Sequence, residues 1–137
     1  PVWVTAQETK TDKVKFAEVD ETVTFQLGFP SGVIASCGTT YNFNNYERLY
    51  VIGDKGFAEL SPAFGYGPIQ GRTHLGPMNQ PLITHQAAQM DGLTDCILNG
   101  TPDPGMTGEE GLKDMVVVDA VYESLRKNGE KIYLGKK

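Results

Sequence analysis

Cysteine, histidine and tryptophan are scarce in this chain of 137 residues, which holds two cysteines, two histidines and one tryptophan. Cys37 and Cys96 follow no C-x-x-C spacing and have no cluster of histidines nearby, so neither a metal site nor a disulfide framework is expected. Free cysteine behaves as a small apolar side chain, and we expect both residues to fill space in the interior. Any binding or catalytic site in the chain is therefore expected to use other residue types.

An excess of positive charge is also missing, since 12 Lys and Arg face 17 Asp and Glu and the net charge is −5. Nonspecific binding to nucleic acid or anionic lipid needs a concentrated positive field. Neither nucleic acid nor a membrane surface is therefore expected as a partner. No apolar run reaches the roughly 20 residues that cross a bilayer.

The first residues, Pro1–Thr5, lack the basic and then apolar pattern of a signal peptide. The compartment is unknown from the sequence, with the cytoplasm favoured over export. An initiator Met is absent, and a strand-like pattern begins at once. We therefore expect a piece cut from a longer chain. Its composition, 39% hydrophobic and 21% charged, is typical of a soluble globular domain, and its length suits one domain.

Apolar and polar residues alternate in the first third of the chain, which predicts strands. The pattern covers Val2–Ala6, then 23–29, and returns over 33–41 after the turn Pro30–Gly32. Antiparallel pairing across this turn predicts an apolar face with Phe25 opposite Cys37. The opposite face, with Gln26 against Ser36, is small, flat and mostly uncharged. We expect helices on the apolar face and water, a ligand or a second sheet on the other.

A second hairpin is predicted from residues 47–52 and 57–60, which flank the turn sequence Gly53–Gly56. Both of its faces carry apolar side chains. One face has Leu49, Val51, Ala58 and Leu60, and the other has Tyr50, Ile52 and Phe57. The chain's own helices can cover one face, so we expect another subunit or domain to cover the second.

The rest of the chain predicts a long irregular loop over 61–82, a helix over 83–99, a second helix ending near Lys127, and a last strand over 131–134. Thr107 and Glu110 form a capping box at the start of the second helix. Gly129 is placed for a left-handed cap at its end. Because no β-α-β alternation occurs, we predict an α+β fold: an open, mainly antiparallel β-sheet with helices packed on one face.

Several groups of residues have alternative interpretations. The glycines of 65–71 have the wrong spacing for a phosphate loop, and Glu109 has a structural role beside Glu110 at a helix start. His74, His85 and Asp91 suffice for an acid–base hydrolase site, but no nucleophile motif accompanies them. An aromatic and amide-rich set suits either sugar binding or ordinary turns and interfaces; its members are Tyr41, Asn42, Asn44, Asn45, Tyr46, Phe64 and Tyr66.

Three segments, 50–60, 86–100 and 108–124, carry a resemblance. The most specific is the G-E-E-G-x-x-D pattern beginning at Gly108, which ends in A-x-Y-E-S at Ser124. Together they resemble the C-terminal domain of the glucose–fructose oxidoreductase (Gfo/Idh/MocA) family. The resemblance implies an open antiparallel α+β domain, like the C-terminal domains of dihydrodipicolinate reductase and glyceraldehyde-phosphate dehydrogenase. In this family a separate N-terminal Rossmann domain holds NAD(H) or NADP(H), and the C-terminal domain shapes the substrate pocket and assembles the oligomer.

The family's glycine fingerprint, its E-K-P segment with the catalytic Lys, and its D-x-G-x-H-like segment are absent. We therefore expect residues 1–137 to be the substrate-binding and oligomerisation domain of an NAD(P)-dependent oxidoreductase, without catalytic or cofactor-binding residues and inactive alone. The resemblance implies hydride transfer between a sugar or polyol carbon and nicotinamide in the full-length protein. A non-catalytic association module that uses the open sheet face is the alternative.

Four residues are predicted to line the substrate pocket: Tyr66, Arg72, His74 and His85. Arg72 and the two histidines have hydrogen-bond donors for hydroxyl oxygens, and the Tyr66 ring suits stacking against a sugar. A sugar-like substrate, the chain's own Rossmann domain and a second copy at the sheet face are the expected partners.

Overall fold

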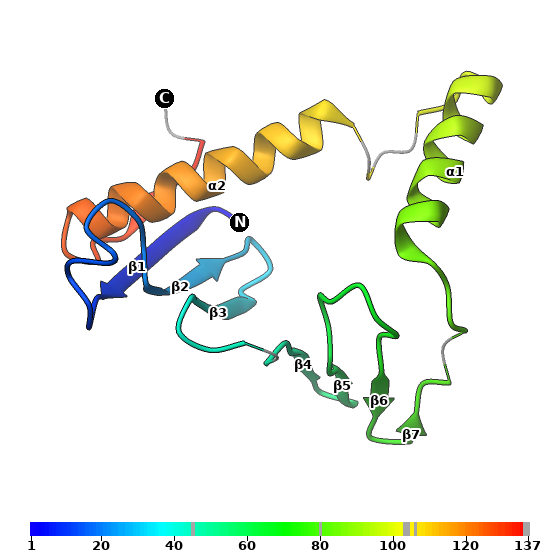
Figure 1. The fold of residues 1–137 in the computed structure, drawn as a ribbon, viewed down its shortest axis with the longest axis horizontal. Coiled ribbons are helices and arrows are strands. Elements are labelled where there is room, and N and C mark those ends of the chain that lie inside the picture. Colours follow the sequence, from blue (N-terminus) through cyan, green and yellow to red (C-terminus); the bar gives the residue numbers. More distant parts are fainter. Residues whose placement is uncertain (45, 80, 103–104, 106, 136–137) are drawn as a thin grey trace. The chain divides into compact units, whose positions relative to one another are not determined.

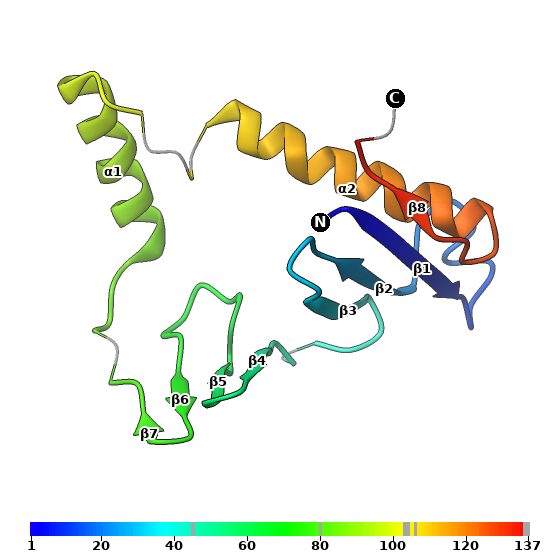
Figure 2. The ribbon, with the colours of Figure 1, turned by 180° about the vertical axis from the view of Figure 1, so that it is seen from behind.

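The computed structural model describes residues 1–44, 46–79, 81–102, 105 and 107–135. The chain divides into two compact units, Pro1–Asn42 with Pro104–Lys137, and Phe43–Asp103. Each unit has its own antiparallel four-stranded sheet and one helix (Figures 1 and 2). The predicted α+β class is confirmed, with the strands divided between two sheets. Neither helix in the described part is long and apolar enough to cross a membrane.

The sheet of the first unit has the strand order β3-β2-β1-β8. Its strands are β1 (Trp3–Thr9), β2 (Thr22–Gly28), β3 (Ile34–Thr40) and β8 (Ile132–Tyr133). The predicted pairing of β2 with β3 is confirmed, since Phe25 lies opposite Cys37 and Gln26 opposite Ser36. The turn between them is closed by the Phe29 N–H, which donates to the Val33 carbonyl oxygen at 2.9 Å. A short turn and one apolar face are enough to determine the register.

Helix α2 (Gly108–Arg126) lies against β1 of this sheet (Figure 1). The buried side chains of Val4 and Ala6 on β1, and Ala120 on α2, belong to the core of this unit. Ser124 is fully buried; its Oγ accepts from the Ala6 N–H at 2.9 Å and donates to the Glu130 carbonyl oxygen at 2.7 Å. One hydroxyl therefore links the helix, the central strand and the C-terminal segment.

Both predicted caps of α2 are present. Thr107 Oγ1 accepts from the Glu110 N–H at 3.3 Å, which satisfies one free donor of the first turn. The Glu110 carboxylate pairs with Lys113 instead of closing the second half of the capping box. At the other end, Gly129 is left-handed with φ 87°, and its N–H donates to the Ser124 carbonyl oxygen at 2.9 Å.

The connection from β1 to β2 is anchored by the buried carboxylate of Glu21. It accepts from the Thr11 N–H at 2.6 Å, from the Asp12 N–H at 3.1 Å and from the Asn42 side-chain amide. Burial by itself would raise the pKa of Glu21, but the hydrogen bonds from Asp12 and Thr11 lower the pKa below its usual value. Asn42, one of the amides considered for sugar binding, therefore has a structural role.

The sheet of the second unit has the strand order β4-β5-β6-β7. Its strands are β4 (Leu49–Gly53), β5 (Gly56–Leu60), β6 (Gly71–Thr73) and β7 (Gly76–Pro77). The β4–β5 hairpin is as predicted, with Val51 opposite Ala58. The expectation of an irregular loop over 61–82 was wrong where β6 and β7 form. Strands of three and two residues are too short to show an alternating pattern, and β6 forms because the edge of β5 offers unpaired backbone groups.

Helix α1 (His85–Asn99) begins two residues later than predicted, after the N-cap Thr84, and ends at the left-handed Gly100. None of its described residues is buried, and its apolar stripe is exposed, including Met90 and Ile97. Both cysteines are free and half-buried rather than interior. Burial raises the pKa of the Cys37 thiol, which keeps that side chain in its neutral form.

Candidate functional site

The register of the second sheet brings charged and aromatic side chains to one face. Tyr50 on β4 lies opposite Glu59 on β5, and Glu59 lies opposite Arg72 on β6. Directly opposed residues share a face, and Ile52 and Phe57, paired two positions along, lie on the same one. This polar and aromatic face continues into the residues that flank the strands.

Glu59 is the centre of an ion cluster on this face and is only 8% exposed. One carboxylate oxygen accepts from Arg48 Nε at 2.6 Å, and the other accepts from Arg72 Nε. The hydrogen bond from Arg72 and, after it, that from Arg48 hold the pKa of Glu59 below its usual value against the opposing effect of burial. We call these three residues the Arg48–Glu59–Arg72 cluster; it is ionised at neutral pH.

Aromatic rings support both guanidinium groups. Arg48 lies 4.6 Å from the ring centroid of Tyr50, and Arg72 lies 5.5 Å from that of Phe57. The Tyr50 and Phe57 rings are 5.4 Å apart, and the His74 ring is 6.4 Å from that of Phe57. Stacking on ring faces fixes the planes of the two guanidiniums. Gly56, with φ 136°, is required here because a Cβ at this position would overlap the His74 ring.

A pocket of about 340 Å³ lies beside the cluster. Its lining combines the charged pair Glu59 and Arg72 with neutral groups from the ends of β5 and β6, namely Ser61, Gln70 and Gly71. Hydroxyl, amide, carboxylate and guanidinium groups in one concave site are suited to a small polar ligand.

A second cavity of the same unit, about 290 Å³, is mainly apolar. His85 is its only ionisable lining residue among those described, and the other lining residues are Leu60, Pro68, Ile69, Met78, Pro81, Leu82 and Ile83. Leu60 lies on the face of β5 opposite Glu59, because successive strand residues alternate. This cavity and the Arg48–Glu59–Arg72 cluster are therefore separate sites.

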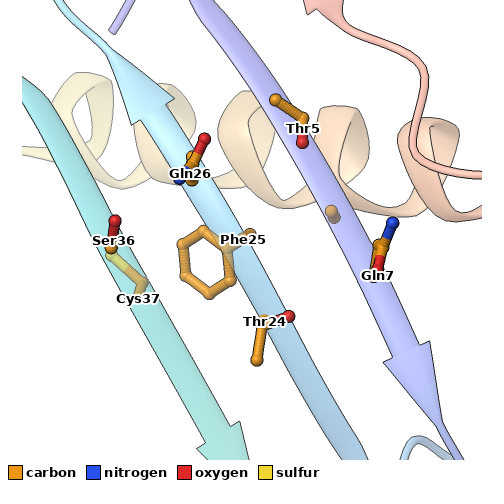
Figure 3. Close-up of a pocket in the computed structure, with 8 residues that line it drawn as sticks. Thr5, Gln7, Thr24, Phe25, Gln26, Ser36 and Cys37 are labelled. Atoms are coloured by element: carbon orange, nitrogen blue, oxygen red, sulfur yellow. The ribbon is translucent and has the colours of Figure 1, made fainter.

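The first unit has a shallow depression of about 380 Å³ on its sheet. Figure 3 shows its lining residues on β1, β2 and β3, with helix α2 behind the sheet. Thr5, Gln7, Thr24, Gln26 and Ser36 supply hydroxyl and amide groups, and none of the lining residues is charged. The small, mostly uncharged face predicted from the sequence is thus present, and Cys37, whose thiol pKa is raised by burial, is the titratable residue among its lining residues.

The four predicted substrate residues all lie in the second unit but not in one place. Arg72 and His74 flank the Phe57 ring, whereas His85 lines the apolar cavity. Tyr66 is 83% exposed and lines neither cavity of that unit. Sequence reasoning missed Glu59 and Arg48. An acidic residue within a predicted strand was the available signal, but its partner Arg72 lies on β6, which the pattern did not reveal.

The described residues do not form the hydrolase site or the phosphate loop that were considered from the sequence. His74 lies beside Phe57, His85 lines the apolar cavity, and Asp91 is exposed on α1, with no hydrogen bond among the three in the described structure. No helix begins within the glycine-rich 65–71 segment, as a phosphate loop requires. No group of three or more His, Cys, Asp or Glu among the described residues is arranged to hold a metal.

The aromatic and amide-rich set is also divided. Tyr41 and Asn42 belong to the first unit, whereas Tyr46, Phe64 and Tyr66 belong to the second. Asn45 lies outside the described residues. The Phe43 and Tyr46 rings are 6.5 Å apart, so a local aromatic contact precedes β4. These residues therefore do not form one sugar-binding surface within either unit.

No protein-family model matches the chain, but it is similar to known proteins that carry the names of sugar dehydrogenases or oxidoreductases. D-xylose 1-dehydrogenase (NADP(+)) of Haloarcula marismortui is 31% identical over 118 residues, which are 80% of this chain and 32% of that protein. The crystal structure of aldose-aldose oxidoreductase from Caulobacter crescentus, complexed with glycerol, is 38% identical with a TM-score of 0.86. It matches over 98% of this chain and 41% of that one.

The fold is also that of scyllo-inositol dehydrogenase from Lactobacillus casei, solved with NAD(H) and scyllo-inositol. That match has 19% identity and a TM-score of 0.72, over 98% of this chain and 42% of that one. The chain thus spans about a third to two fifths of the length of these relatives. The chain is similar in sequence to the xylose dehydrogenase and the aldose-aldose oxidoreductase, and similar in fold to both solved structures. It therefore belongs to the Gfo/Idh/MocA oxidoreductase family and matches part of the C-terminal region of its members.

Proposed function

We propose that this chain is the C-terminal domain of an NAD(P)-dependent oxidoreductase that acts on a sugar or a related polyol. In the full-length protein, hydride passes between a secondary hydroxyl or carbonyl carbon and the nicotinamide. The observation that carries the proposal is the 38% identity to an aldose-aldose oxidoreductase across 98% of the chain. The similarity to an NADP(+)-linked xylose dehydrogenase supports the same reaction class.

The cofactor, NAD or NADP, supplies the hydride acceptor or donor. The described residues offer no strand, glycine turn and helix to hold its pyrophosphate, so they do not fit the dinucleotide by themselves. An N-terminal Rossmann domain holds it in this proposal. Residues 1–137 then form the substrate-binding and oligomerisation domain, and the chain by itself is inactive.

Within the domain, Arg72 and His74 are proposed to donate hydrogen bonds to the substrate from the polar and aromatic face. The exposed donors of Arg72 and the His74 ring next to Phe57 support this assignment. His85 is proposed to act from the apolar cavity, and Tyr66 is proposed to stack on the sugar ring from its exposed position. The separation of these groups favours a substrate pocket that other parts of the full-length protein complete.

Steady-state kinetics of the full-length enzyme test this proposal. A panel of aldoses and polyols with NAD or NADP is expected to give turnover with at least one pair, and no turnover with any pair contradicts the reaction class. Arg72→Ala, His74→Ala, His85→Ala and Tyr66→Ala are expected to raise the substrate KM more than the cofactor Kd. Lys55→Ala, on the β4–β5 turn, is the matched surface control. Unchanged KM for all four variants contradicts the residue assignment.

A second proposal, that this sheet face also joins copies of the protein, is supported by the apolar residues near the β4–β5 turn. Ile52 is 75% exposed, and Tyr50 and Phe57 lie on the same face. Exposed apolar groups beside aromatic rings are typical of interfaces. Ile52→Asp is expected to reduce the oligomer measured by size-exclusion chromatography with light scattering, whereas Val14→Asp, in the exposed β1–β2 connection, is expected to leave it unchanged. An unchanged mass for Ile52→Asp contradicts this interface.

A further inference from the structure

The Arg48–Glu59–Arg72 cluster carries more positive than negative charge. Two guanidiniums share the single carboxylate of Glu59, so one positive charge is not compensated within the cluster. The chain as a whole has a net charge of −5, which makes this local reversal of sign distinctive. We propose that the cluster is a binding site for a small oxyanion: the carboxylate of a sugar acid or the phosphate of a sugar phosphate.

Arg72 is held so that its terminal donors remain usable, whereas Arg48 also has a side-chain hydrogen bond with Tyr46. Glu59 accepts from Nε of each arginine, and the rings of Tyr50 and Phe57 support the guanidinium planes. The terminal nitrogens of Arg72 have no hydrogen-bond partner among the described residues, and its side chain is 62% exposed. A planar guanidinium with its terminal donors free matches the two oxygens of a carboxylate or phosphate. Because the side chains are already ordered by Glu59 and the rings, binding costs less side-chain entropy.

The pocket beside Arg72 has room and chemistry for the rest of such a ligand. Its volume of about 340 Å³ lies at the small end of the range for ligand sites. Ser61 and Gln70 on its lining have a hydroxyl and an amide that donate and accept hydrogen bonds. These groups suit the hydroxyls that neighbour the anionic group of a sugar acid or sugar phosphate.

This site borders the apolar contact proposed between copies, with which it shares the Tyr50 and Phe57 rings. The register places Ile52 and Phe57 next to the β4–β5 turn, whereas Glu59, Arg72 and Ser61 lie toward the other end of the strands. It also goes beyond the proposed redox function, because binding of an oxyanion needs neither the nicotinamide nor turnover. A merely structural bridge between strands would change stability when Arg72 is replaced but would have no effect on affinity for anions.

Isothermal titration calorimetry of the complete protein, without nicotinamide cofactor and at about 0.15 M ionic strength, tests the site. The probes are gluconate for a carboxylate, glucose 6-phosphate for a phosphate, and glucose as the neutral reference. At least one anion is expected to bind about tenfold more tightly than glucose, since hydrogen bonds to a charged group are stronger than those to a neutral one. Preference for one anion identifies the group, and equal binding of both supports an oxyanion site of general type.

Arg72→Gln is expected to weaken binding of the preferred anion by about tenfold, whereas Lys55→Gln, which removes the same charge from the turn of the same sheet, changes it less than about twofold. Arg48→Gln provides a second test if Arg72→Gln does not fold, as judged by circular dichroism. Equal losses in the arginine and Lys55 variants, or no preference of either anion over glucose, overturn the proposal. Neither result decides the outcome of the redox assay, because that assay measures turnover with a nicotinamide cofactor and the calorimetry is done without one.

Discussion

The two units of the chain differ in how much apolar surface they bury for themselves. In the first unit, Val4, Ala6, Phe16, Val23 and Ala120 are buried. In the described part of the second unit, Ala63 is the only buried apolar residue, and its other buried side chain is the charged Glu59. The same kind of four-stranded antiparallel sheet thus supports a core in one unit and an open surface in the other.

This difference follows from what each sheet has against its faces. Helix α2 covers β1, so alternate residues at the start of that strand are buried, and their removal from water stabilises the fold. In β4 all five residues are exposed, and in α1 none of the described residues is buried. We infer that the first unit is stabilised by its own contacts, whereas the second retains side chains for binding partners or ligands. The following variants test that division.

The largest expected effect compares one substitution in both sheets. Val4→Ala removes two methyl groups from a fully buried position and is expected to lower the free energy of unfolding by about 2–3 kcal/mol. Val51→Ala, at a position that is 57% exposed, is expected to change it by less than about 0.5 kcal/mol. Urea denaturation measures both. Equal losses of unfolding free energy would mean that the second sheet is also covered in the protein, and would contradict the inferred difference between the two units.

The buried hydroxyl of the first unit gives the next effect. Ser124→Ala leaves the Ala6 N–H and the Glu130 carbonyl oxygen without their partner, at an expected cost of about 1–2 kcal/mol. Hydrogen exchange of the Ala6 amide should become faster. Ser36→Ala, on the exposed face of β3, is the control and should have little effect on stability. Slow exchange at Ala6 in the Ser124 variant would show that another group satisfies that donor.

The N-caps of α1 and α2 allow a direct test of the difference between the two units, because both are threonines. Thr107 accepts a hydrogen bond from the Glu110 N–H, whereas Thr84 makes no side-chain capping bond. Thr107→Ala is therefore expected to cost about 1 kcal/mol and Thr84→Ala only a few tenths. Chemical denaturation with helix content followed by circular dichroism measures the difference. A larger loss in Thr84→Ala would indicate that Thr84 caps α1 in solution.

The smallest expected effect concerns the Arg48–Glu59–Arg72 cluster and depends on pH. The pKa of Glu59 is below its usual value in the folded protein, so its ionised form stabilises the fold above the unfolded-state pKa. This contribution is lost as the pH falls through the lower folded-state pKa. The melting temperature of Glu59→Gln should therefore lie below that of the wild type at about pH 7, and the gap should close on acidification below about pH 4.

Glu18→Gln is the matched control for this titration, because Glu18 is exposed in the first unit. It should show no difference from the wild type that depends on pH in this way. A gap for Glu59→Gln that persists unchanged in acid would indicate that the loss comes from packing rather than from charge. That outcome would contradict the ionised cluster as a source of stability in the second unit.

The elements predicted from the sequence are those whose signals are local. The β2–β3 register follows from a three-residue turn and alternating residues such as Phe25 and Leu27. The N-cap at Thr107 and the left-handed Gly129 follow from residues only a few positions from the helix ends. Strands β6 and β7 could not be predicted this way, because they are short and depend on the edge of β5 for hydrogen bonds.

The candidate site was predicted only in part for the same reason. Arg72 and His74 were expected to act near a ligand, and the structure places both beside Phe57. Glu59 and Arg48 were not recognised, because their roles depend on a register that joins β5 to β6. His85 and Tyr66 were expected to share the pocket with Arg72, yet they lie outside the cluster. Residues distant in sequence meet only once strand pairing is known.

Sequence alone thus determined the fold class, the paired strands around two tight turns, the capped second helix and the resemblance to a family of oxidoreductases. Each of these depends on a periodicity, a turn residue or a motif within a short stretch of chain. Tertiary structure alone decided that Ser124 links α2 to β1 and that Glu59 holds Arg48 and Arg72 on one face. Such contacts arise because backbone pairing brings together side chains whose spacing along the chain has no periodic signal.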